Sequence, residues 1–251
     1  MRKILVFIAL QLMLFATPWH STSAFALAEN ENRLMQLQSL HFNVFYHSGQ
    51  DSLASFVMQS ALQSLPRIEE KIGYRLNGKL DLFLLNDPSV SNPRITEPHS
   101  LNHSLTGGST KILGQRIHIN ADSDFKELQH QVSKGIALNL LHEMLYGGTA
   151  QERIKYATLL HLPDWFTQGL TQYIAMDWNE NLDNELRNAL LHNHYKNLNK
   201  LGSEQSALLG HSLWRYIDQN KGDHAIRRNL YSVRISKKLE NAFYFIYNQS
   251  S

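Results

Sequence analysis

A histidine and a lysine lie four residues apart in a segment with helical spacing. The segment runs from His130 through Gln131 to Lys134, and residues at this spacing share one face of a helix. Two histidines in these places, with a glutamate after the first, would hold Zn²⁺ and a general base for hydrolysis. Here glutamine takes the place of the base and lysine the place of the second histidine. Because an amide is no base and an ammonium repels a metal cation, we expect no zinc site here.

A second segment of the same kind lies further along the same predicted helix. His142 is followed by Glu143, but Tyr146 stands where a second histidine would be. One histidine does not make a catalytic zinc site, which normally takes three protein ligands. The 13 histidines of the chain keep one alternative open. It is an atypical zinc site with Glu143 as the catalytic base and His142 as one ligand. The other ligand would be His161 or a histidine from the loop around His99 and His103.

Composition excludes several other classes of function. The 251 residues are 43% hydrophobic and 18% charged, which is typical of a globular chain with one or two cores. Cysteine is absent, which excludes disulfides, thiolate metal sites, a cysteine nucleophile and a lipid-anchoring cysteine. Neither a glycine-rich phosphate-binding motif nor a Gly-x-Ser-x-Gly motif occurs. We therefore do not expect a phosphate-binding loop or a serine hydrolase.

The N-terminus has the three parts of a secretory signal peptide. Arg2 and Lys3 precede an apolar run that ends near Phe15, and small residues follow up to Ala26. We expect cleavage after Ala26 or Ala28. The mature protein is then exported, soluble, and periplasmic or secreted.

The mature chain is expected to carry balanced charge. Residues 1–26 hold two of the 24 Lys and Arg and none of the 22 Asp and Glu. Without an excess of positive charge we expect no nucleic-acid partner, and no later apolar run is long enough for an integral membrane segment. We expect a polar lead-in over 27–38 and a single domain over 39–251, with a sheet half (39–122) and a helical half (123–251).

The sheet half is predicted to be a small mixed sheet with one helix. Its predicted strands are residues 41–46, 79–85, 110–113 and 116–120. The helix covers 52–72, where Pro66 starts a second helical piece or kinks the first. The Pro, Ser, Asn and Gly residues of 86–110 predict a long irregular connection.

The helical half has apolar residues at intervals of three to four. Its predicted helices are 125–146, 149–160, one that begins at Pro163, 182–197, 204–219, 224–233 and 237–247. Gly169 is expected to let two helices approach closely. Aromatic residues at helical spacing are expected in the core: Trp165, Phe166, Tyr173, Trp178, Trp214 and Tyr216. The predicted class is α+β.

The helix that begins at Pro163 carries the sequence Leu162-Pro-Asp-Trp-Phe-Thr-Gln-Gly-Leu-Thr-Gln-Tyr173. This segment and the order of elements before it resemble the gluzincin-like (peptidase MA-like) metallopeptidases. In that family the long helix carries H-E-x-x-H, and the later helix carries W-F-x-E-G-L-x-x-Y with its glutamate as third zinc ligand. The matching positions here are Trp165, Phe166, Gly169, Leu170 and Tyr173, and Gln168 stands at the glutamate position.

A resemblance to a more specific group of proteins covers about residues 40–247. The segments that carry it are 145–166, 177–187 and Gly210-His-Ser-Leu-Trp214. Together they resemble the N-terminal domain of exported Bacteroidetes proteins, in which a peptidase MA-like domain precedes a TolB-like β-propeller.

This resemblance implies a thermolysin-like helical half with a vestigial groove, formed by His130, Gln131, Lys134, His142 and Gln168. Since this chain keeps at most one of the three zinc ligands of the family, the resemblance implies a catalytically inactive metallopeptidase-like domain without metal or other cofactor. Such a pseudoenzyme would act as a binding or scaffolding module for an unidentified protein or peptide. Two alternatives stay open. One is the atypical peptidase or hydrolase with zinc as cofactor, and the other is a truncated stand-alone paralogue of a TolB-like propeller protein.

Overall fold

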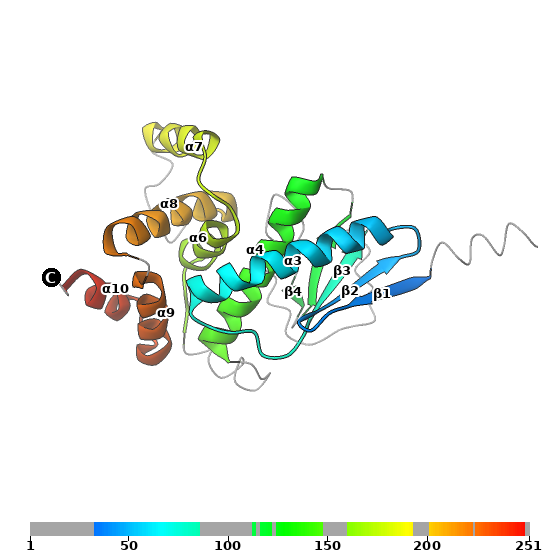
Figure 1. Ribbon diagram of the computed structural model, residues 1–251. Coiled ribbons are helices and arrows are strands. Elements are labelled where there is room, and N and C mark those ends of the chain that lie inside the picture. The colour runs from blue at the N-terminus through cyan, green and yellow to red at the C-terminus, as the bar shows by residue number, and fades with distance from the viewer. Residues whose placement is uncertain are drawn as a thin grey trace, which may run out of the picture.

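The structure is a computed structural model that describes residues 33–85, 112–113, 116–121, 124–147, 160–192, 201–222 and 224–248. A small sheet lies at one end of the molecule and helices fill the other (Figure 1). The predicted α+β class is confirmed. The expected signal peptide and the connection 86–110 lie outside the described residues, as does the expected helix 149–160 except for Leu160.

The sheet is mixed and has the order β1-β2-β3-β5-β4. Its central strands run parallel: β2 (Phe42–His47), β3 (Leu80–Leu85) and β5 (Arg116–Asn120). The edge strands β1 (Leu34–Gln38) and β4 (Ile112–Leu113) are antiparallel to their neighbours. The last two predicted strands, 110–113 and 116–120, correspond to β4 and β5. However, the sheet already begins at Leu34, within the segment expected as a polar lead-in.

One face of the sheet contributes to the core. Alternate residues of the three central strands are buried, as their period of two predicted: Phe42, Val44, Tyr46, Leu80, Leu82, Leu84, Ile117 and Ile119. The crossover helix α3 (Asp51–Ile72) joins β2 to β3 and packs on this face. It is one continuous helix through Pro66. Pro66 is exposed, so the carbonyl that loses its helical partner lies on the solvent side.

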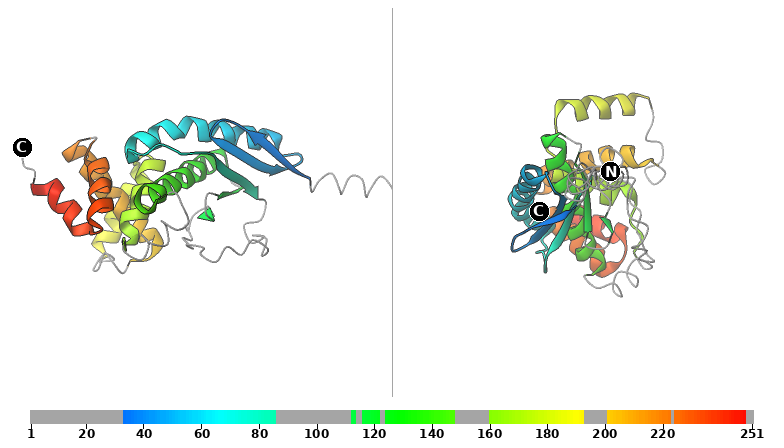
Figure 2. Two further views of the ribbon diagram at one scale, coloured as in Figure 1. Left: turned by 90° about the horizontal axis from the view of Figure 1, so that it is seen from below. Right: turned by 90° about the vertical axis from the view of Figure 1, so that its right-hand side faces the viewer.

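Helix α4 (Phe125–Tyr146) is the central element of the molecule. Asp124 caps it by accepting a hydrogen bond from the Glu127 backbone N–H at 2.8 Å, and Gly147 follows its last residue. Every residue from Gln131 to Leu141 is buried, because α4 packs against α3, β5, α6 and α9. Figure 2 shows α3 and α4 side by side, running from the sheet to the C-terminal helices.

The C-terminal helices are α6 (Asp164–Ala175), α7 (Glu180–Leu191), α8 (Ser203–Lys221), α9 (Ala225–Ser236) and α10 (Leu239–Asn248). Phe166 and Trp214 are fully buried, and the Trp214 indole Nε1–H donates to the Phe166 carbonyl at 3.0 Å. Tyr216 is 56% exposed, so its predicted place in the core was wrong. Helix α7 stands away from the other helices and has no buried residue. In the described part of the chain, no helix combines the length and apolarity needed to cross a bilayer.

Candidate functional site

Two glycines set how α6 and α8 cross. Gly169 on α6 lies against Gly210 on α8, and a Cβ on Gly210 would come within 2.6 Å of the Gly169 Cα. The close approach predicted at Gly169 is therefore confirmed. It places buried Gln168 and buried His211, each adjacent to one of the two glycines, at the same crossing.

The crossing faces the first of the two histidine segments on α4. The charge of His130 acts on His211, which places these two side chains near each other. His142 lies about three turns further along α4, roughly 18 Å along the helix axis at 1.5 Å per residue. Of the two alignments with the family motif, the geometry favours the one in which His130, Gln131 and Lys134 accompany Gln168.

Gln131, at the position that the resemblance gives to the general base, has a structural role. Its side-chain Oε1 accepts a hydrogen bond from the Asn120 backbone N–H at 3.0 Å, and its Nε2 donates to Glu127 Oε1 at 3.3 Å. The buried amide thus ties α4 to the end of β5. Both of its polar atoms are engaged, so this side chain is directed to the sheet and is not free to position a water molecule.

Lys134, at the position that the resemblance gives to the second histidine, has a buried side chain. Only 9% of this residue is exposed. Burial lowers the pKa of the Lys134 amine, and Glu127 on the same helix partly opposes that shift. Glu127, His130 and Lys134 lie at helical spacing on one side of α4, and His130 Nδ1 lies 3.6 Å from Glu127 Oε2. Together with the amide at Gln168, this lysine does not fit a zinc ion.

His211 is the most deeply buried histidine of the crossing, with 1% of its surface exposed. Its ring lies edge-on to Trp178 at a centroid distance of 5.0 Å and to Tyr173 at 5.7 Å. Burial, with smaller contributions from the charges of Arg215 and His130, lowers the pKa of His211 to about 4 against the opposing effect of Asp177. The imidazole is therefore neutral near pH 7.

The second histidine segment lies at the C-terminal end of α4. His142 is half-buried with its ring 5.6 Å from that of Tyr146, and Glu143 is buried. Burial raises the pKa of Tyr146 to about 12, so its hydroxyl stays protonated. His161, a candidate for the other ligand of the alternative zinc site, is exposed just before α6. Within the described ranges, no group of three or more His, Asp or Glu side chains is arranged to hold a metal ion.

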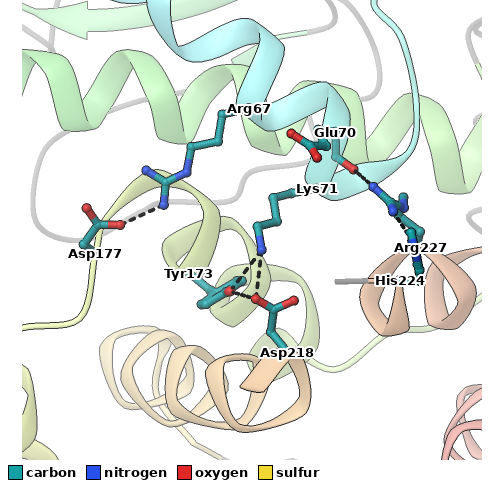
Figure 3. A network of polar contacts seen from close by, with 8 residues as sticks. All are labelled: Arg67, Glu70, Lys71, Tyr173, Asp177, Asp218, His224 and Arg227. Atoms are coloured by element: carbon teal, nitrogen blue, oxygen red, sulfur yellow. Dashed lines mark hydrogen bonds and ion pairs between the residues drawn. The ribbon is translucent and has the colours of Figure 1, made fainter. Parts of the chain in front are cut away.

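A polar network fastens the crossing to α3 (Figure 3). The Lys71 ammonium donates to Asp218 Oδ2 at 2.8 Å, and the Tyr173 hydroxyl donates to the same oxygen at 2.5 Å. Burial would raise the pKa of Asp218, but these two hydrogen bonds and the charge of Lys71 outweigh it, so the pKa is lowered. A single carboxylate therefore joins α3, α6 and α8.

A second connection, between α3 and α9, lies beside this network. Arg227 NH1 donates to the Glu70 carbonyl at 2.8 Å, and Arg227 NH2 also contacts His224 Nδ1 (Figure 3). The network and this contact hold four helices together. Neither the pairing of Lys71 with Asp218 nor the place of His211 at the crossing could be predicted from the sequence, because each depends on contacts between residues far apart in the chain.

No protein-family model matches the chain, and no curated protein matches it either. The resemblance to metallopeptidases therefore stands on the motif residues alone.

Proposed function

We propose that this protein is an exported metallopeptidase-like domain that has lost hydrolytic chemistry and works as a binding or scaffolding module. The observation that carries the proposal is Gln131. In the alignment that the helix crossing favours, this residue takes the place of the general base, and its amide holds α4 to β5. A side chain used in this way supplies no base for attack by water.

The charge at the ligand positions supports the same proposal. Catalytic zinc needs ligands that donate electron pairs, normally three from the protein. A buried lysine, Lys134, and a buried amide, Gln168, stand there instead, and neither belongs to the His, Cys, Asp and Glu side chains that hold zinc in proteins. The residues around the α4–α6–α8 crossing thus favour recognition by hydrogen bonds and charge over metal-assisted hydrolysis.

Zinc affinity tests the proposal directly. Purified mature protein is titrated with Zn²⁺ by calorimetry, and its metal content is measured after isolation. We expect no retained zinc and no peptide hydrolysis. A zinc ion retained at one per chain, together with hydrolysis that a chelator abolishes, would favour the alternative enzyme with Glu143 and His142.

Restoring the family pattern gives a matched pair of variants. Gln131→Glu with Lys134→His and Gln168→Glu rebuilds the motif in the favoured alignment, and Tyr146→His with Gln168→Glu rebuilds it in the other. We expect a gain of zinc binding from the first set only. If only the second set gained zinc binding, the segment from His142 to Tyr146 would be the part of α4 that corresponds to the family motif.

A further inference from the structure

Buried polar atoms without partners gather at the crossing of α4, α6 and α8. Among the described residues, the ring atoms concerned are His130 Nε2, Trp178 Nε1 and both nitrogens of His211. Such atoms are uncommon in native proteins, because each loses its hydration without gaining a hydrogen bond. Their concentration around one buried histidine points to a ligand that completes these hydrogen bonds.

Two of these three rings are in direct contact. Trp178 and His211 meet edge-on at 5.0 Å, and the charge of His130 acts on His211 from α4. The guanidinium of Arg215 lies 5.2 Å from the centre of the Trp178 ring. An indole N–H only donates, an arginine only donates, and a neutral imidazole donates from one of its nitrogens. The cluster is therefore rich in hydrogen-bond donors.

Positive charge exceeds negative charge in the same place. Lys134 lies one turn after His130 on α4, and its described electrostatic partner is Glu127. Asp177, the carboxylate that acts on His211, is already paired with Arg67 at 2.7 Å. Glu127 is thus shared between Lys134 and His130, and Arg215 adds a further cation.

We propose that this cluster, formed by His130, Lys134, Trp178, His211 and Arg215, binds a carboxylate-bearing ligand. A carboxylate offers two oxygens with about four acceptor positions, which complements N–H donors that converge from α4, α8 and the α6–α7 connection. Charge-assisted hydrogen bonds of this kind are stronger than neutral ones. The carboxylate belongs either to the C-terminus of a peptide or to a free organic acid. The inference rests on the proposed function, because it names the ligand class of that binding module.

Three probes separate the two sources. N-acetyl-alanyl-alanine carries a free carboxylate, its C-terminal amide carries none, and acetate carries a carboxylate without a peptide. Binding is followed by tryptophan fluorescence, because Trp178 lies in the cluster, and by the NMR titration of His211. We expect saturable binding of a carboxylate probe that raises the pKa of His211, and no binding of the amide. Tighter binding of the peptide acid than of acetate identifies a peptide terminus, and equal binding identifies a free acid.

Two variants test whether the cluster itself is the site. Lys134→Met and His211→Leu should each weaken carboxylate binding about tenfold or more. Lys126→Met is the matched control, because Lys126 lies on α4 and is exposed, and it should leave binding unchanged. Circular dichroism confirms that each variant is folded. Because Lys134→Met removes a buried charge, it is expected to fold even if His211→Leu does not.

Two results would overturn the inference. One is the absence of saturable carboxylate binding by folded wild-type protein, in which case ordered water completes the hydrogen bonds. The other is binding that both cluster variants retain. Neither result bears on the proposed function, which fails only if the protein binds zinc tightly and hydrolyses peptides.

Discussion

The buried imidazole of His211 makes the stability of the fold depend on pH. Its pKa is about 4 in the folded protein and 6.5 in an ordinary exposed histidine. The unfolded chain therefore takes up a proton first as the pH falls, so stability is present above the unfolded pKa and is lost toward the folded one. From neutral pH to about pH 5, this group alone should lower the free energy of unfolding by about 2 kcal/mol.

Urea unfolding followed by tryptophan fluorescence measures this loss at about pH 7.5 and about pH 5. His211→Leu removes the titrating group while keeping an apolar side chain against Tyr173 and Trp178. The wild type should lose about 2 kcal/mol more than this variant between the two pH values. His192, exposed at the end of α7, provides the control, since His192→Gln should keep the wild-type loss. An equal loss in wild type and His211→Leu would refute the assignment of this histidine as buried and neutral.

Three further predictions follow from packing, charge and the N-terminal sequence. Gly210→Ala should destabilise the protein by about 1 to 3 kcal/mol in urea unfolding, because the added Cβ would overlap α6. Gly202→Ser is the control and should change stability little, because it adds atoms in open space. A neutral Gly210→Ala would mean that the helices cross further apart. Lys71→Met should lower the free energy of unfolding by about 1 to 3 kcal/mol, since it removes the cation from the mostly buried carboxylate of Asp218. Arg67→Met should lower it by about 0.5 kcal/mol or less, because the pair of Arg67 with Asp177 is exposed. Equal losses would contradict the role of the Asp218 network. Mass spectrometry of the protein from its producing cell should find an N-terminus at Leu27 or Glu29, and an intact Met1 would disprove export.

Local patterns were sufficient to predict most elements of the fold. The alternation of Phe42, Val44 and Tyr46 predicted β2. The helical spacing of apolar residues predicted a helix over 125–146, and α4 has these bounds, with Asp124 before it and Gly147 after it. Strand β1 was missed because four of its five residues are exposed. An edge strand with so little burial leaves no alternating pattern to recognise.

The candidate site was only partly predictable, because it depends on how helices cross. The motif residues on α4 and α6 were identified from their spacing, and the close approach at Gly169 was expected. Its partner Gly210 and the neighbouring His211 lie in a segment that carries the resemblance, but nothing in that segment predicts which helix they contact. They meet α4 only through tertiary packing, which also decides between the two histidine segments.

Zinc binding by the unmodified mature protein distinguishes an inactive domain from an active zinc hydrolase. Isothermal titration with Zn²⁺, combined with metal analysis of protein isolated without a chelator, gives both affinity and stoichiometry. With an amide at 131, a lysine at 134 and an amide at 168, we predict weak binding and less than one zinc per chain. One tightly held zinc per chain, lost on His142→Ala and accompanied by peptide hydrolysis, would contradict the account.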